Sequence, residues 1–362
     1  MSIYEMPWRL EWNKLIRYPG GREIDRFRGI KPAKDDGRPE AWVGSDTRVF
    51  NITADTPNEG CAKVILPSGE VKYLFEAIAE NPEAVLGDKH IEINGKNMSV
   101  LVKLLDAEKQ LGLQCHPTRE KAMKYYDSAY GKAESWYIIG VREDVEEPPY
   151  VLMGFKEGVT KEVYGEAYDT GDVKNMEACI HKVPVRVGDV FNIAAGLPHA
   201  VGTGCFLIEV QEPSDITIGW SKLQVRGAIS NRIHELHREI LLDCYEYDSG
   251  SLEYILDKYR IEPEVIGENE NGKELLMLGE KQTPFFSFSQ VETTSSYSVK
   301  ETGFLRVMIV LEGSGTIKWD GGEMKINKAD EIFVPYGVKN MSFVSDGGTL
   351  KVVMCNPPMK KI

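Results

Sequence analysis

Cysteine is scarce in this sequence, and its few occurrences are unpaired. The 362 residues include six cysteines, and no two of them form a C-x-x-C pair. This scatter excludes the disulfide framework of a small secreted domain and favours reduced thiols in the cytoplasm. The six positions are Cys61, Cys115, Cys179, Cys205, Cys244 and Cys355.

Long apolar runs are missing as well. No run reaches the roughly 18 residues that a membrane-spanning helix needs. The first residues are interrupted by Glu5, Arg9 and Glu11, so they lack the apolar stretch of a signal peptide. The sequence therefore predicts no association with a membrane, in keeping with a cytoplasmic protein.

Positive charge is in deficit. The chain has 43 Lys and Arg against 56 Asp and Glu, which gives a formal net charge of −13. This balance excludes nucleic acid as a general partner, because a polyanion is repelled by an acidic surface. A local basic pocket for a small phosphate stays possible, so we expect a small-molecule partner. The oligomeric state is left open.

The sequence does contain two regions whose residue pattern is typical of β-strands. At 42% hydrophobic residues, the chain is long enough for about two domains. Short apolar runs alternate with glycine turns after residue 183 and again after residue 283, which is typical of sandwiches and jelly rolls. We therefore predict a mainly β chain with a unit at 1–225 that carries helical insertions, a helical or irregular connection at 226–282, and a second unit at 283–362.

Apolar spacing predicts the individual elements of this chain. Helical periodicity indicates four helices, at residues 72–81, 118–126, 160–180 and 229–242. Short β-branched or aromatic runs predict strands, the main ones at 100–105, 111–115, 135–141, 190–193, 205–210, 285–291, 305–311, 332–334 and 350–354. Residues 243–282 are charged and are expected to be irregular.

Histidine is rare enough, at six residues, for each one to be weighed as a metal ligand. If residues 113–117 form a strand, Gln114 and His116 lie on one face, because side chains alternate. His199 lies at a strand–turn edge, and Glu134 precedes an aromatic strand. Two imidazoles, a carboxylate and an amide suit Zn²⁺ or another first-row divalent ion, with a position open for substrate.

Each of these residues also has a plainer interpretation. A single histidine on a strand is more often structural than a ligand, and Glu134 taken alone is typical of a surface acid. His234 and His237 are three apart, but the charged residues around them indicate a solvated helix face. His90 and His181 have no supporting pattern.

In these segments the sequence resembles the type I phosphomannose isomerases. The resemblance rests on residues 101–117, which contain Gln114 and His116, on 131–138 with Glu134, and on 183–200 with His199. A short segment, 40–45, resembles a further family motif. The matching segments span roughly residues 1–225 and follow the family's order.

The resemblance implies a cupin fold and a set of site residues. The second cupin motif fits Gly188, Gly196 and His199, with Ala194 in the place of proline. By resemblance the zinc ligands are Gln114, His116, Glu134 and His199. The second unit looks like a cupin without metal, since Asn340 occupies the histidine position there.

The resemblance also implies a reaction, the interconversion of mannose 6-phosphate and fructose 6-phosphate through an enediol. Such a reaction needs a Lewis acid and a group that moves protons. Lys132 precedes Glu134 by two residues and is implied in proton transfer, and Glu209 matches an acidic pocket position. Lys103 matches a lysine that contacts phosphate.

Two departures from the family pattern concern the substrate. Gly219 stands where the family usually has an arginine considered catalytic, and Gly112 stands where a serine contacts phosphate. Lys222 or Arg226 could supply the missing charge, as a phosphate-binding and a catalytic residue respectively. We therefore carry three hypotheses: a zinc-dependent isomerase of mannose 6-phosphate, a related cupin enzyme for a different or unphosphorylated sugar, and a non-catalytic sugar-binding cupin.

Overall fold

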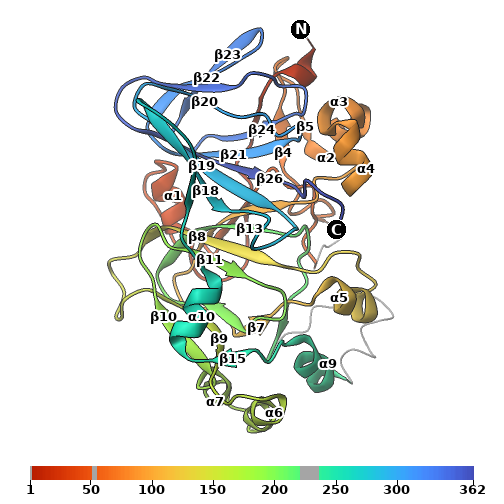
Figure 1. Cartoon of the computed structure of the whole chain (residues 1–362), viewed down its shortest axis with the longest axis vertical. Coiled ribbons are helices and arrows are strands. Elements are labelled where there is room, and N and C mark those ends of the chain that lie inside the picture. Colours follow the sequence, from red (N-terminus) through yellow and green to blue (C-terminus); the bar gives the residue numbers. More distant parts are fainter. Residues whose placement is uncertain (1, 51–54, 221–235) are drawn as a thin grey trace.

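A computed structural model describes residues 2–50, 55–220 and 236–362 of the chain (Figure 1). Strands dominate these residues, which confirms the prediction of a mainly β protein. The sheets are open, so they form facing layers and not closed barrels. All six cysteines are free. Among the described helices, none is long and apolar enough to cross a bilayer.

The described strands form two pairs of facing sheets. In the first pair, one sheet has nine strands. Their order is β17 (Glu264–Asn269), β18 (Gly272–Leu278), β19 (Ser287–Thr293), β26 (Leu350–Asn356), β21 (Arg306–Glu312), β24 (Glu331–Val334), β1 (Trp8–Leu10), β4 (Lys63–Ile65), β5 (Val71–Tyr73). Facing it is a four-stranded sheet, in the order β20 (Ser296–Ser298), β25 (Ser342–Ser345), β22 (Ser314–Trp319), β23 (Gly322–Asn327).

The second pair contains the segments that resemble the family motifs, residues 101–117, 131–138 and 183–200. Its seven-stranded sheet has the order β16 (Arg260–Ile261), β11 (Val190–Ile193), β8 (Glu134–Val141), β13 (Cys205–Gln211), β6 (Leu101–Asp106), β3 (Glu40–Val43), β2 (Lys14–Leu15). Facing it are β10 (Ile180–Pro184), β9 (Tyr150–Lys156), β12 (His199–Val201), β7 (Gln114–Cys115) and β14 (Ile218–Gly219), with β15 (Ser249–Gly250) parallel to β9.

Most helices lie at the margins of these sheets, whereas α10 packs on strands β9 and β11 (Figure 1). The helices are η1 (Ile3–Glu5), α1 (Arg22–Phe27), α2 (Leu74–Glu80), α3 (Pro82–Leu86), α4 (Asp88–Asn94), α5 (Arg119–Tyr126), α6 (Lys161–Asp169), α7 (Val173–Glu177), α9 (His237–Cys244) and α10 (Leu252–Tyr259). Thr118 caps α5 by accepting a hydrogen bond from the Lys121 N–H, so this helix begins where proline and threonine predicted it. α9 covers the described end of the helix predicted at 229–242, and residues 229–235 lie outside the described part.

Alternating side chains explain how the sheets stack. On β13, Phe206 and Ile208 point into an apolar layer shared with the nine-stranded sheet, whereas Leu207 points toward the six-stranded partner sheet. The seven-stranded sheet is therefore buried on both faces, which is why its strands are almost continuously apolar. A third apolar layer lies between the nine-stranded and four-stranded sheets.

Three features differ from the sequence interpretation. The helix predicted at 160–180 is interrupted, because α6 ends at Asp169, α7 covers only Val173–Glu177, and strand β10 begins at Ile180. Residues 243–282 are not irregular: they contain α10 and the antiparallel pair β17–β18, whose outer strand is largely exposed and includes Glu264 and Glu268. The N-terminal strand β1 pairs with β24, so early residues join the sheet of the C-terminal half. The predicted domain boundaries stay a prediction.

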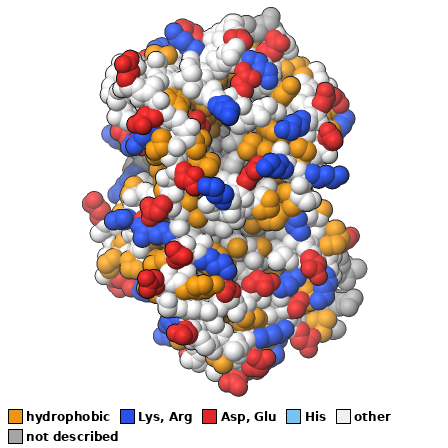
Figure 2. Space-filling model, viewed as in Figure 1, with side chains coloured by type: hydrophobic (Ala, Val, Ile, Leu, Met, Phe, Trp, Pro, Cys, Tyr) orange, Lys and Arg blue, Asp and Glu red, His pale blue; other side chains and the backbone are white. Residues whose placement is uncertain are grey.

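Acidic and basic side chains are interspersed over the face of the molecule seen in Figure 2. Many of them are in ion pairs that are half exposed, such as Lys182 with Glu147. Such pairs contribute little to stability because water screens them. Buried ion pairs lie in both halves of the fold: Lys103 pairs with Glu209 in the seven-stranded sheet, and Arg28 pairs with Glu331 at the nine-stranded sheet.

Candidate active site

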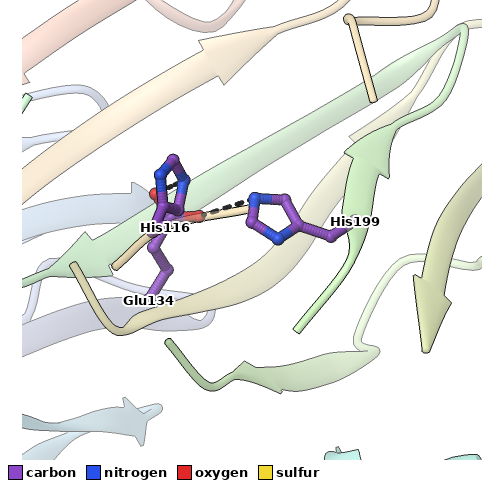
Figure 3. A group of neighbouring side chains, drawn as sticks. All are labelled: His116, Glu134 and His199. Carbon is purple, nitrogen blue, oxygen red and sulfur yellow. Dashed lines mark ion pairs between the residues drawn. The ribbon is translucent and has the colours of Figure 1, made fainter. Parts of the chain in front are cut away.

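Three side chains from both sheets of the second pair meet at one point. His116 follows β7, His199 begins β12 and Glu134 begins β8, and their ligand atoms all lie within 4.8 Å of one another. Figure 3 shows both imidazoles turned toward the carboxylate. All three residues are buried, so the plainer interpretation of Glu134 as a surface acid is wrong.

Hydrogen bonds fix the orientation of both imidazoles. Nδ1 of His116 lies 2.9 Å from the Ile216 carbonyl oxygen, and Nδ1 of His199 lies 2.8 Å from that of Leu197. A carbonyl only accepts, so each Nδ1 carries the hydrogen and each Nε2 keeps its lone pair. Both Nε2 atoms face Glu134, at 3.1 Å and 3.9 Å from its carboxylate oxygens.

The local electrostatics favour the forms that bind a cation. Burial, and after it the charge of Lys132, lowers the pKa of His116 to about 3, and burial lowers the pKa of His199. Burial opposes ionisation of Glu134, but the positive charge of Lys132 holds its pKa well below the usual value. The cluster therefore consists of two neutral imidazoles and a carboxylate.

The donor set fits a divalent metal. Both carboxylate oxygens of Glu134 are buried and accept no hydrogen bond from the described residues, although Lys132 Nζ lies 3.0 Å away. Buried polar atoms without partners are rare and call for a ligand. Gln114 lies opposite His199 in the strand register, with its amide nitrogen 3.5 Å from His199 Nε2. Rotation of the amide would present its oxygen there.

A pocket of about 830 Å³ adjoins this cluster. Its walls come from both sheets of the pair and include a set of charged and polar side chains: Arg17, Glu40, Lys103, Gln114, Lys132, Glu134, Glu209, Asp215 and His237. His237 also lies 3.1 Å from the Gly219 carbonyl oxygen through Nε2, so it belongs to the pocket wall and not to a solvated face. Gly112 and Gly219 line the pocket too.

Register explains why these charges share one face. On β6, β13 and β8 the residues Lys103, Glu209 and Trp136 are direct cross-strand neighbours. Lys103 Nζ donates to Glu209 at 2.8 Å, and Trp136 Nε1 donates to the other oxygen at 3.1 Å. Burial opposes the charge on Lys103, yet Glu209 and Glu40 raise its pKa above the usual value. Lys103 and Lys132 are both buried.

The structure thus brings most of the predicted residues together. Gln114, His116, Glu134 and His199 form one cluster, Lys132 borders it, and Lys103 with Glu209 lies on the adjoining wall. Lys222 and Arg226 lie outside the described residues, so the choice between them stays open.

Sequence reasoning missed Arg17, and it gave no role to Glu40 or Asp215. Leu15 lies opposite Glu40 in the register of β2 and β3, and Arg17 is two residues further along the chain. Because side chains alternate along a strand, Arg17 would lie on the same face as Leu15. No neighbouring sequence pattern indicates that this face lines a pocket.

Comparison with known proteins gives the class. A family model described as "Phosphomannose isomerase type I, catalytic domain" matches residues 28–137. A mannose-6-phosphate isomerase of Streptococcus mutans is 26% identical over 320 residues, covering 84% of this chain and 92% of that protein. Mannose-6-phosphate isomerase ManA of Bacillus subtilis is 27% identical over 247 residues, covering 68% of this chain and 72% of that protein.

A solved structure shares the fold over nearly the whole chain. The crystal structure of the mannose 6-phosphate isomerase of Bacillus subtilis aligns with a TM-score of 0.74 at 17% identity, covering 97% of this chain and 99% of that one. This likeness shows the fold alone, and the sequence relatives indicate the class, an aldose–ketose isomerase, which is an intramolecular oxidoreductase. Within that class, the chain is similar to the type I phosphomannose isomerases, whose catalytic-domain model matches residues 28–137.

Proposed function

We propose that this protein is a zinc-dependent isomerase that interconverts mannose 6-phosphate and fructose 6-phosphate in the cytoplasm. The observation that carries the proposal is the buried His116, Glu134 and His199 cluster, which adjoins a pocket large enough for a sugar phosphate. The names of the relatives support the substrate.

The residues divide the work of the reaction between them. Gln114, His116, Glu134 and His199 would hold the zinc ion, which supplies Lewis acidity toward a carbonyl when bound. Moving that carbonyl between C1 and C2 takes a proton from one carbon and gives it to the other. Lys132 Nζ lies 3.2 Å from His116 Nε2, so we assign the proton transfer to the Lys132 side chain at the border of the cluster.

Lys103 and Glu209 act from the neighbouring wall. We propose that Lys103 attracts the phosphate, because its buried ammonium is held charged by two carboxylates. Both oxygens of Glu209 already accept hydrogen bonds, from Lys103 and Trp136. This arrangement favours a positioning role for Glu209 over direct proton transfer.

A second candidate keeps the metal but changes the substrate. Gly112 and Gly219 line the pocket and offer no hydroxyl or guanidinium to a phosphate. A Cβ at Gly112 would meet nothing within 4 Å, so open space is left at this wall. A different or unphosphorylated sugar would suit such a wall, and a protein that binds sugar without turnover is the remaining alternative.

Metal removal and a substrate screen test the proposal. The purified chain is analysed for metals, stripped with a chelator and reloaded with Zn²⁺, and fructose 6-phosphate formation is followed in a coupled assay. We expect turnover to vanish on stripping and to return with Zn²⁺. Turnover of mannose but not of mannose 6-phosphate supports the second candidate, and binding without turnover of either supports the third.

A matched pair of variants locates the metal. His199→Ala removes a predicted ligand, whereas His181→Ala removes a histidine that lies 2.9 Å from the Gly250 carbonyl oxygen and outside the cluster. We expect the first variant to lose bound zinc and activity and the second to keep both. Stoichiometric zinc in His199→Ala would contradict the assigned site.

A further inference from the structure

The positively charged side chains of the pocket differ in how many of their hydrogen-bond donors already have a partner. Among the described lining residues the full positive charges are Arg17, Lys103 and Lys132. Lys103 lies 2.8 Å from Glu209, and Lys132 lies 3.0 Å from Glu134. Each ammonium therefore faces a carboxylate at contact distance, and both sit deep in the wall with little exposed surface.

Arg17 differs from these lysines in how many donors it has left. A guanidinium carries five N–H donors. Within the described residues the Arg17 side chain makes one hydrogen bond, from a terminal nitrogen to Asp215 Oδ2 at 3.0 Å. Its Nε is buried and donates to none of them, with Glu40 3.9 Å away. The side chain is 16% exposed, so part of it still reaches open space.

Arg17 is also held in place from several sides. Its guanidinium lies over the Trp42 ring, 5.3 Å from the centroid. Asp215 Oδ2 is fixed in turn by the Phe50 N–H at 2.8 Å. Burial raises the pKa of Asp215, but the charge of Arg17, followed by those of Lys103 and Lys132, brings it below the usual value, so the pair is ionic. A guanidinium fixed by one carboxylate oxygen keeps its remaining donors oriented.

These observations lead to one substrate-binding residue beyond the set found from the sequence. We propose that Arg17 binds an anionic oxygen of the sugar substrate in this pocket, with Asp215 as its positioning residue. The inference rests on the proposed isomerase function. The oxygen belongs either to the phosphate or to the enediolate that forms during the reaction, and both are anions that a guanidinium binds through charged hydrogen bonds.

Two variants and a matched control test the proposal in the zinc-loaded full chain. Arg17→Gln removes the charge, Arg17→Lys keeps the charge and loses the planar donors, and Arg260→Gln removes a comparable guanidinium that pairs with the buried Asp189 outside the pocket. We expect kcat/KM for mannose 6-phosphate to fall by about 10- to 100-fold in Arg17→Gln, by less in Arg17→Lys, and by less than about twofold in the control.

Whether the Arg17 variants change KM or kcat identifies the substrate oxygen that Arg17 binds. If it is the phosphate, KM and the inhibition constant of inorganic phosphate rise together while kcat holds. If it is the enediolate, kcat falls and phosphate inhibition is unchanged. Arg17→Gln with all three constants within twofold of the parent overturns the proposal. Should that variant fail to fold, unchanged constants in Arg17→Lys overturn it equally, because only the planar donors are lost there.

The outcome separates this inference from the proposed function. If the parent protein turns over mannose 6-phosphate and the Arg17 variants match it, the function stands and the inference is wrong. If the parent does not turn it over, the proposed function is wrong. Calorimetric titration with mannose 6-phosphate and with inorganic phosphate then tests whether Arg17 binds an anion. Weaker binding of either probe by Arg17→Gln supports anion binding, and equal binding of both overturns it.

Discussion

The buried pair of Lys103 and Glu209 gives a prediction whose size follows from the structure. At 2.8 Å and an effective dielectric constant near 20, their attraction is about 6 kcal/mol. Glu40, at 4.0 Å, would still contribute about 4 kcal/mol to a Lys103 left without Glu209. Breaking a buried pair usually costs about 3–5 kcal/mol, so we expect Glu209→Gln to lose about 3 kcal/mol of unfolding free energy, near the lower limit.

A double-mutant cycle measures this interaction. Lys103→Met, Glu209→Gln and the double variant are compared in urea unfolding followed by circular dichroism. We expect each single change to be strongly destabilising and the double variant to recover at least half of the summed loss, because no unpaired charge is left buried. The half-exposed pair of Lys182 and Glu147 serves as the control, with effects below about 1 kcal/mol. Additive single effects at Lys103 and Glu209 would refute the reasoning.

Three further predictions concern stability. Burial lowers the pKa of His90 below that of an unfolded chain, so the unfolded state binds more protons below about pH 6.5. As the pH falls below this value, the unfolding free energy of the metal-free protein should decrease by up to about 1.4 kcal/mol per pH unit through this group. Thermal melts of His90→Gln should show a smaller decrease in stability with falling pH. Arg28 and Glu331 form a fully buried ion pair between α1 and β24, so Glu331→Gln should cost about 3–5 kcal/mol in urea unfolding, and a cost below about 1 kcal/mol would contradict this. Zinc at about 100 times its dissociation constant should raise the unfolding free energy by about 2.7 kcal/mol, and His199→Ala should abolish that increment.

Much of the fold follows from local patterns. Short β-branched runs between glycine turns predict the strands of the C-terminal half, and the threonine at 118 predicts the start of α5. The strand pair β17–β18 was missed because its exposed outer strand carries charges that resemble a loop. The pairing of β1 with β24 joins residues more than 300 positions apart, and no short-range pattern contains that information.

The candidate site, like the fold, has some features that the sequence predicts and others that it does not. The four predicted metal ligands are found together because their spacing follows a family motif that a linear sequence displays. The contact between Lys103 and Glu209 depends on the register of β6 against β13, and the contact between Arg17 and Asp215 depends on chain segments that meet only after folding. Contacts of this kind are visible only in the tertiary structure, since no local sequence pattern pairs these residues.

The stacking of the sheets ties the chemistry to the distant half of the chain. Strands β6, β8 and β13 place site residues on one face, and their other face shares an apolar layer with strands such as β19 and β21. A cavity opened by trimming Val307 or Phe288 in that layer would loosen the strands that carry Lys103 and Glu209. Engineering of residues 264–362 therefore has to be screened for turnover as well as for folding, even though none of these residues, all of which the structure describes, lines the pocket.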